Sequence, residues 1–321
     1  MTPSALSWTQ LSQRAAGWSP TTRGILWTSA AGLLFSGLNA TLRLLSSTMD
    51  PFQAQFLRYF LGLVVLLPVM LHHGGIGGIR DYWPKRVAPQ FTRGFVHSVG
   101  LALWFAALPR IPLADMTAIG FTGPIFIMIG AHYFFQEPMQ WERWAATLAG
   151  FAGVMIVVGP RISGDGGTGH LLMLASAPVF ACSFLLTKAL TRTESPGVIV
   201  VWQSITVALF SLPFALLHWR AMSGTEWAGF VMCGVLGSAG HYCLTRSFVA
   251  ADISATQSAK FLDLMWSAIM GYLLFADVPN QTTLLGGMVI CGSTIWVARR
   301  DARYQKRPEP AAERLEPDGS P

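Results

Sequence analysis

Lys260, Asp263 and Trp266 recur at intervals of three residues inside a long apolar run. Side chains three residues apart share one face of a helix, so the amine and the carboxylate can neutralise each other and still offer hydrogen-bonding atoms to a cavity. An ionisable side chain inside a membrane is costly unless it is paired or wetted, which marks the pair as a candidate site. Two interpretations remain open. Either Asp263 contacts a substrate or carries a coupling proton, with Lys260 tuning its charge state, or the pair is structural and Trp266 packs beside it.

Arg58 is a second candidate, because it lies about seven residues inside an apolar run, roughly 10 Å deep at a helical rise of 1.5 Å per residue. It either lines a cavity or bonds to helix carbonyls. His241 and Tyr242 lie in the middle of another apolar run, and Trp104 aligns with His241 in the internal repeat described below. A histidine and aromatic rings at this depth could stack on a planar ring or bind an anion, or they could simply pack in the interior.

The apolar runs that carry these residues identify the elements that position them. Of the 321 residues, 52% are hydrophobic and only 12% are charged, which is too little charge to build a soluble surface. A membrane-spanning helix needs about 20 mainly apolar residues. Ten such spans are expected, over residues 24–45, 52–71, 90–108, 114–134, 141–158, 171–190, 198–218, 227–249, 255–275 and 283–298.

The charged residues and the cysteines exclude several other functions. The four cysteines show no CxxC spacing and fall inside apolar runs, so neither a disulfide framework nor a metal site is expected. The net charge of +6 is spread over loops and the tail, which is typical of a topology signal and not of nucleic-acid binding. Only Arg110, Arg161 and Arg220 lie in the loops opposite to the side that holds both termini. Positive loops stay in the cytoplasm, so we expect both termini there.

The two halves of the chain resemble each other at a spacing of about 137 to 140 residues. In this alignment Asp115 matches Asp252, and Glu137 matches Asp277. Each half holds five spans, an odd number, so the second half must enter the membrane inverted relative to the first. The expected organisation is a cytoplasmic leader at 1–23, five-helix repeats at 24–160 and 168–300, and a disordered cytoplasmic tail at 301–321.

The sequence resembles the EamA-type drug/metabolite transporter superfamily in DPFQAQFLRYF at Asp50, in the stretch from LWFAALPRIPLADMTAIGFTGPIF at Leu103 to ERWAATLAGFAGVMIVVGPR at Glu142, and in KFLDLMWSAIMGYLLFADVP at Lys260. The resemblance covers nearly everything between the leader and the tail. It implies a ten-helix carrier of the bacterial inner membrane, built from two inverted five-helix halves. The last segment is most similar to a subgroup associated with uptake of S-adenosylmethionine or riboflavin, whose ninth helix holds an acidic residue and a tryptophan, here Asp263 and Trp266. Lys260 departs from the small or apolar residue expected at its position.

We therefore expect an all-α integral membrane protein that acts as a secondary transporter of a small organic metabolite by alternating access. The excess of cations in the spans favours a zwitterionic or partly anionic solute, and the resemblance favours S-adenosylmethionine or riboflavin. Two alternatives remain: an exporter of amino acids, metallophores or drugs from the same superfamily, and a multi-span membrane enzyme. The sequence holds no HExxH, GxSxG or phosphate-loop motif, so we expect no catalytic residue and no cofactor. The expected substrate-binding residues are Arg58, Trp104, His241, Tyr242, Lys260, Asp263 and Trp266.

Overall fold

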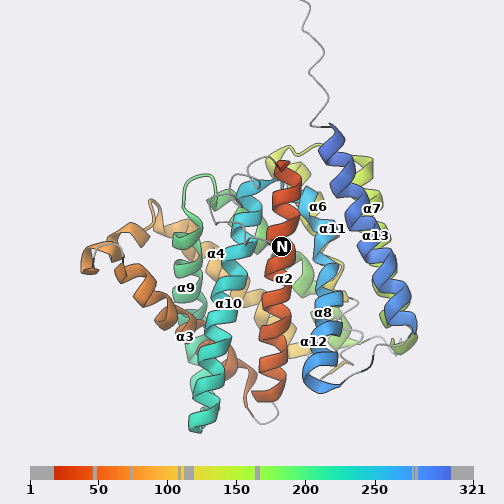
Figure 1. Ribbon diagram of the computed structural model, residues 1–321. Coiled ribbons are helices and arrows are strands. Elements are labelled where there is room, and N and C mark those ends of the chain that lie inside the picture. Colours follow the sequence, from red (N-terminus) through yellow and green to blue (C-terminus); the bar gives the residue numbers. More distant parts are fainter. Residues whose placement is uncertain are drawn as a thin grey trace, which may run out of the picture.

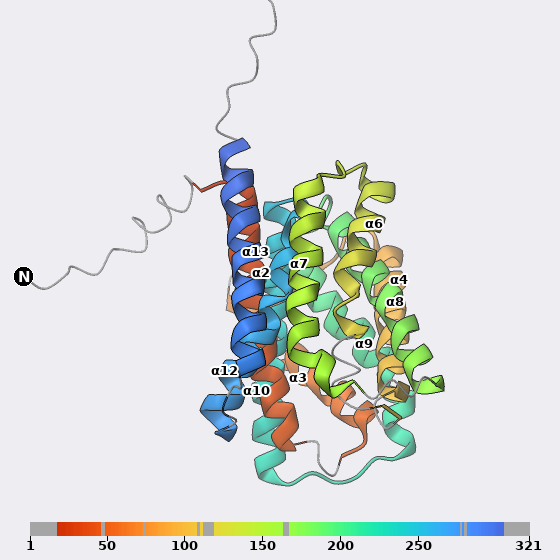
Figure 2. The same cartoon turned by 90° about the vertical axis from the view of Figure 1, so that its right-hand side faces the viewer.

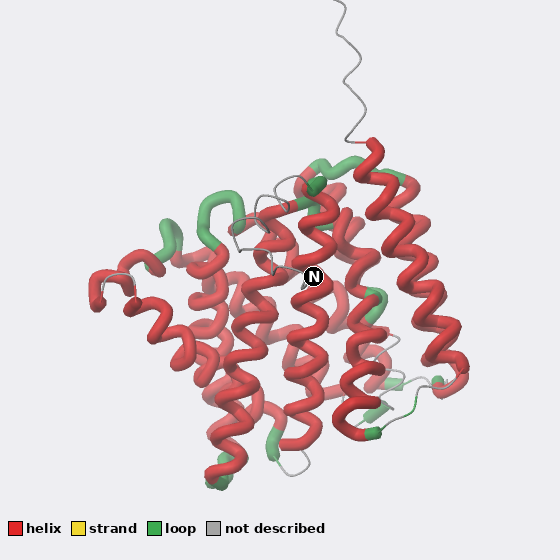
Figure 3. The backbone as a smooth tube through the Cα atoms, viewed as in Figure 1, coloured by secondary structure: helices red, strands yellow, loops and turns green. Residues whose placement is uncertain are grey.

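The computed structural model describes residues 18–45, 49–72, 75–107, 110–111, 119–162, 167–276, 278 and 281–304, and over these residues it holds helices and loops but no strand (Figure 3). Most helices run up or down along one common direction (Figures 1 and 2). The ten longer helices are α2 (Pro20–Leu45), α3 (Pro51–His72), α4 (Val87–Ala107), α6 (Gly123–Phe135), α7 (Trp141–Val158), α8 (Thr168–Leu190), α9 (Pro196–Leu217), α10 (Gly224–Ala250), α12 (Leu262–Phe275) and α13 (Gln281–Tyr304). Shorter helical turns are η2 (Gly75–Tyr82), η3 (Gly159–Arg161), η4 (Ser254–Thr256) and α11 (Gln257–Lys260).

Six of the described helices, α2, α3, α8, α9, α10 and α13, are long and apolar enough to cross a membrane by length and composition. The other four fall short of that measure for visible reasons. α4 carries Arg93 and His97, and α7 begins with Glu142 and Arg143. α6 and α12 have only 13 and 14 residues, about 20 Å of helix. Each of the ten expected runs nevertheless overlaps with one of the ten longer helices.

Two of the expected spans are interrupted helices; the sequence indicates a break in the fourth span at Gly123 and Pro124 but none at Phe261 in the ninth. In the ninth span, η4 and α11 lead into α12 through a turn at Phe261; in the fourth, a turn at Phe121 and Thr122 precedes α6. Pro124 lies in the first turn of α6, where proline is tolerated at a helix start but would break a continuous helix. The rings of Phe121 and Phe261 stack with their centroids 5.6 Å apart. Interrupted helices in corresponding positions of two halves are typical of transporter binding sites.

The two halves end these helices with the same cap. Gln136 follows α6 and Ala276 follows α12, and they are the only non-glycine residues with positive φ in the described part of the chain, at 57° and 55°. In both caps the backbone N–H faces the carbonyls four and five residues earlier. Their numbers differ by 276 − 136 = 140, the spacing of the sequence repeat. Because a side chain is rarely tolerated in this left-handed region, the shared cap is specific evidence of duplication.

Helix packing follows the same duplication, with α2, α3, α4, α6 and α7 matching α8, α9, α10, α12 and α13 in order. α2 packs against α10, and its counterpart α8 packs against α4. α3 packs against its own counterpart α9, and α7 against α13. Exchanging the halves leaves these pairs unchanged, as expected for two repeats related by an axis in the membrane plane. The protein is therefore an all-helical membrane protein with ten helices in two inverted five-helix repeats.

The helix pair α7 and α13 is held close by glycines. A Cβ atom added at Gly286 would lie 2.4 Å from the carbonyl oxygen of Gly153, and one added at Gly153 would lie 2.9 Å from the carbonyl oxygen of Gly286. Such backbone contact is the usual way in which membrane helices pack without a hydrophobic driving force.

The outer surface of the bundle is apolar. Phe134, Leu217 and Leu273 are exposed to 75%, 71% and 65%, and many further leucine, valine and tryptophan side chains are exposed as well. Soluble proteins rarely expose contiguous apolar surface on this scale. The surface is suited to contact with lipid chains.

The described helices differ from the expected boundaries at both ends. α2 begins at Pro20 and α13 continues to Tyr304, so residues 20–23 of the expected leader and 301–304 of the expected tail are helical. Residues 1–17 of the leader and 305–321 of the tail, together with Asp115 and Asp277 of the predicted repeat, lie outside the described residues.

Candidate functional site

Lys260 and Asp263 lie on either side of the turn at Phe261, which separates α11 from α12. Lys260 Nζ is 2.8 Å from Asp263 Oδ2, and the two side chains are 21% and 25% exposed. The pair lies against the middle of α2, because a Cβ atom added at Gly32 would lie 2.0 Å from Asp263 Oδ1 and 3.2 Å from Trp266 Cδ1. Asp263 and Trp266 therefore face the same point on α2, as their spacing predicts.

Three polar atoms of the predicted site residues are buried without a hydrogen-bond partner among the described residues. They are the acceptor Asp263 Oδ1 and the donors Trp266 Nε1 and Arg58 Nε. Burying a polar atom without a partner costs about 1–3 kcal/mol. Other buried side chains, such as Gln90 and Gln257, also hold unpartnered atoms, so a binding role is favoured here because these three atoms lie on residues that carry charge or an aromatic ring.

A second cluster forms around His241 of α10. Arg58 Nη2 lies 3.4 Å from His241 Nε2, and the hydroxyl of Tyr59 lies 3.2 Å from the same nitrogen. The Tyr59 hydroxyl also lies 3.2 Å from Nε2 of His97 on α4, and Gln203 Nε2 of α9 reaches both the hydroxyl and His241 Nε2 at 3.4 Å. Four helices, two from each repeat, thus meet in one buried polar cluster.

Phe35 of α2 lies between the two clusters. Its ring meets that of His241 edge-on with centroids 5.0 Å apart, and Lys260 Nζ lies 5.8 Å from the centre of the same ring. Gly240 makes room for Phe35, because a Cβ atom there would lie 2.8 Å from the ring. Cations, a carboxylate and aromatic rings therefore adjoin one another at the interface of the repeats, a combination that can bind a polar molecule with a planar ring.

Arg93 has a structural environment, unlike Arg58. It is 2% exposed, its Nε donates to Thr187 Oγ1, its Nη2 donates to Gln203 Oε1 at 2.7 Å, and its Nη1 donates to the Ile199 carbonyl at 3.4 Å. These bonds tie α4 to α8 and α9 and fix the amide of Gln203. Arg93 therefore stabilises the cluster around His241 through its bond to Gln203.

Two predicted site residues lie apart from these clusters. Tyr242 is 39% exposed while its neighbour His241 is 7% exposed, because successive residues of a helix point about 100° apart. Trp104 packs beside Phe105 and against a separate apolar cluster of Ala107, Ile111 and Met173. We therefore drop both from the proposed site and retain Arg58, His241, Lys260, Asp263 and Trp266.

Tyr59, Gln203 and Phe35 were not singled out by the sequence, and His97 was given no role. One signal could have found Gln203. α3 begins at Pro51, and its counterpart α9 begins at Pro196, 145 residues later. At this offset Gln203 has the same position in α9 that Arg58 has in α3. Tyr59 and Phe35 carry no such signal, because aromatic residues are common in apolar spans.

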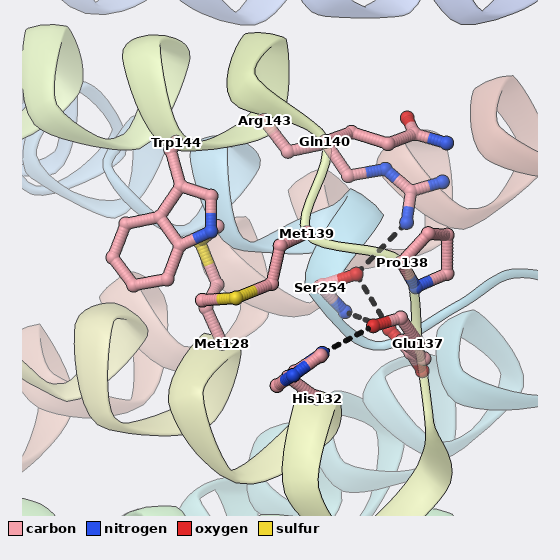
Figure 4. A pocket seen from close by; sticks show the side chains of 9 residues that line it. All are labelled: Met128, His132, Glu137, Pro138, Met139, Gln140, Arg143, Trp144 and Ser254. Carbon is pink, nitrogen blue, oxygen red and sulfur yellow. Dashed lines mark hydrogen bonds between the residues drawn. The ribbon is translucent and has the colours of Figure 1, made fainter.

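A third polar cluster lies at the end of the bundle where the first and last described residues also lie (Figure 2). Glu137, in the loop between α6 and α7, accepts hydrogen bonds from the backbone N–H groups of Ile253 and Ser254, both at 3.0 Å, and from Ser254 Oγ. Arg143 of α7 donates to Ser254 Oγ at 2.9 Å and to Asp252 at 3.2 Å. Figure 4 shows Glu137, Arg143 and Ser254 turned toward one another.

This cluster joins the two repeats at one end of the bundle. The cavity beside it, lined by His132, Glu137 and Trp144 among others, has a volume of about 10 Å³ (Figure 4). That is room for about one water molecule, and far too small for a metabolite. We interpret the cluster as a tie between the α6–α7 loop and the start of η4.

We expect Glu137→Gln to weaken this tie measurably. The glutamine retains one acceptor oxygen for two buried N–H donors, and an unsatisfied donor costs about 1–3 kcal/mol. The melting temperature of the purified protein should fall by several degrees. Ser254→Ala is the comparison variant: it removes the hydroxyl and its bonds to Glu137 and Arg143, but both N–H bonds to Glu137 and the bond from Arg143 to Asp252 remain, so it should cost less. Equal melting temperatures for Glu137→Gln and the wild type would contradict this interpretation.

Comparison with known proteins agrees with the fold. The model of the EamA-like transporter family matches residues 22–159 and 167–299. A riboflavin transporter of Rhizobium johnstonii is 32% identical over 288 residues, which cover 89% of this chain and 94% of the relative. An S-adenosylmethionine uptake transporter of Rickettsia felis is 28% identical over 284 residues, which cover 88% of this chain and 95% of the relative.

A solved crystal structure shares the fold, with a TM-score of 0.76 at 19% identity, covering 88% of this chain and 99% of the other. The family match falls on two halves of almost equal length, as the duplicated caps and helix pairs do. The matching family and the named relatives are transporters, which excludes the membrane-enzyme alternative. This chain is a multi-pass membrane protein that belongs to the EamA-like transporter family.

Proposed function

We propose that this protein is a secondary transporter that moves a zwitterionic or partly anionic metabolite with a planar ring, with riboflavin and S-adenosylmethionine as the first candidates. The observation that carries the proposal is the set of unpartnered buried atoms on Arg58, Asp263 and Trp266. An arginine donor can take a carboxylate or carbonyl oxygen, and the free Asp263 oxygen can take an N–H group. The rings of Phe35 and Trp266 offer apolar faces to a heterocycle.

Alternating access accounts for the position of the site. Arg58 and Phe35 belong to the first repeat, whereas His241, Lys260 and Asp263 belong to the second. A movement of one repeat against the other would change the distance between these groups while the solute remains between them. The contact of Asp263 with α2 at Gly32 then represents one of two positions of α12.

We further propose that the protein lies in the inner membrane of a bacterium with both termini in the cytoplasm. The N-terminal end of α2 and the C-terminal end of α13 lie at the same end of the bundle (Figure 2). The leader, loops and tail expected on that side hold most of the Lys and Arg residues. A fluorescent reporter fused to the C-terminus should therefore fold and fluoresce in cells. A dark but fully expressed fusion would contradict this orientation.

Counterflow in proteoliposomes tests the proposed function. Vesicles are loaded with one unlabelled solute, and entry of the same labelled solute is followed for riboflavin, S-adenosylmethionine and a set of amino acids. We expect saturable exchange of riboflavin or S-adenosylmethionine. If the folded protein exchanges neither, the substrate proposal fails. If it exchanges only amino acids, the amino-acid exporter alternative is favoured, and accumulation against efflux in whole cells decides the direction.

A further inference from the structure

We propose that Tyr59 and His97 are positioning residues that hold the ring of His241 in its orientation and thereby hold the guanidinium of Arg58 toward the solute. The inference deepens the proposed function, because it assigns Arg58 an acceptor group of the solute as its partner. It stands on the hydrogen-bond directions within the buried cluster, which can be assigned in sequence from the groups that can only donate.

The first assignment concerns Gln203. Its Oε1 lies 2.7 Å from Arg93 Nη2, and a guanidinium can only donate, so this amide atom must be the oxygen. The other amide atom, Nε2, is therefore a donor. It faces the Tyr59 hydroxyl and His241 Nε2, both at 3.4 Å.

The second assignment concerns His241. Its Nε2 faces two groups that can only donate, Arg58 Nη2 and Gln203 Nε2. A protonated ring nitrogen cannot accept a hydrogen bond, so Nε2 carries no proton and the ring hydrogen is on Nδ1.

The remaining directions follow from the single proton of Tyr59. The contact with the bare Nε2 of His241 at 3.2 Å is a hydrogen bond only if the hydroxyl donates, and Nε2 then shares its one lone pair among three donors. The contact with His97 Nε2 at 3.2 Å must then run the other way, with His97 Nε2–H donating to the tyrosine oxygen. His97 Nδ1 is left bare and accepts from Ser183 Oγ at 3.1 Å. One chain of bonds runs from Ser183 through His97 and Tyr59 to His241.

The chain determines where Arg58 points. The donors Arg58 and Gln203 keep His241 Nε2 free of a proton, and the bond from Tyr59 keeps the ring in the orientation in which Nε2 faces Arg58. The Tyr59 ring adds a second contact, because Arg58 Cζ lies 4.9 Å from its centre. Arg58 Nε has no hydrogen-bond partner among the described residues and is the atom left for the solute. Loss of Tyr59 or His97 would thus act on the solute through His241 and Arg58.

Two substitutions of His97 separate positioning from packing. A glutamine places an amide N–H near the position of Nε2 and can still donate to Tyr59, whereas an asparagine reaches only the position of Nδ1. Counterflow of the labelled solute that the wild type exchanges should give a KM raised about tenfold in His97→Asn and Tyr59→Phe, because a lost hydrogen bond is worth about that factor. His97→Gln should stay within about threefold of the wild type. Equal KM values for the two His97 variants, or a lowered melting temperature with unchanged KM, would overturn the proposal.

Histidine ¹⁵N NMR on the purified protein is independent of transport. We expect His241 to carry its proton on Nδ1 and His97 on Nε2, with signals assigned by the loss of each in a variant. Tyr59→Phe should shift the Nε2 signal of His241, because this nitrogen loses one of its donors, while the proton stays on Nδ1. The opposite tautomers would overturn the proposal even if transport of riboflavin is confirmed, and the predicted tautomers would support it even if no tested solute is exchanged. If a pH gradient drives uptake by the wild type but not by Tyr59→Phe, the chain of hydrogen bonds serves proton transfer. That result would also overturn the proposed positioning role.

Discussion

Asp263→Asn is expected to lower the transport rate about a hundredfold or more at solute concentrations below KM. The substitution leaves Lys260 as an unpaired cation inside the membrane and removes the free acceptor Oδ1. Breaking one partner of a buried ion pair costs about 3 kcal/mol or more, and each 1.4 kcal/mol corresponds to about a factor of ten. The initial rate of counterflow measures the effect.

The double variant Lys260→Leu with Asp263→Asn decides between the two interpretations of the pair. Removing both charges leaves no unpaired ion, so the double variant should regain the melting temperature of the wild type. If Asp263 contacts the solute, transport stays lost although the protein is folded. If the double variant recovers transport, the pair is structural and Asp263 must leave the proposed site.

Gly32→Ala is expected to reduce transport about tenfold or more. The new methyl group would lie 2.0 Å from Asp263 Oδ1, so the carboxylate must leave its position against α2. Overpacking at a helix contact costs about 1–3 kcal/mol. We expect a lower maximal rate of exchange, because α12 can no longer reach the position that this structure shows.

Gly37→Ala is the matched control on the same helix. A methyl group there would meet only Leu236 at 3.7 Å, which is an ordinary contact. It should leave counterflow and the melting temperature unchanged. Equal transport by Gly32→Ala and Gly37→Ala would mean that the approach of Asp263 to α2 is irrelevant to the transport cycle.

The sequence predicted the helices well, because each span is a long apolar run and length in a membrane is a strong physical signal. It also placed Lys260, Asp263 and Trp266 on one face, since spacing within a helix determines relative direction. The interruption at Phe261 was missed, because the turn lies within apolar sequence and carries no polar break. Pro124 indicates a break in the fourth span, but a proline alone does not show at which residue the helix begins.

The site was only partly predictable for a related reason. A lone span does not reveal which of its faces meets another helix, so His241 and its exposed neighbour Tyr242 were not distinguished. Trp104 was included through the repeat alignment, although its neighbours differ from those of His241. The bonds among Tyr59, His97 and Gln203 join residues up to 144 positions apart, and such contacts depend on helix packing that one sequence does not disclose.

The most direct test of the account is the reactivity of a cysteine at position 35, between the two polar clusters. In a variant that lacks Cys182, Cys233, Cys243 and Cys291 and still transports, Phe35→Cys is exposed to a membrane-impermeant maleimide on either side of the vesicle. A transport pathway that passes Phe35 predicts labelling from both sides in turn and slower labelling when the transported solute is present. A cysteine that reacts from neither side, or at a rate that saturating solute leaves unchanged, would contradict a solute site between Arg58 and Asp263.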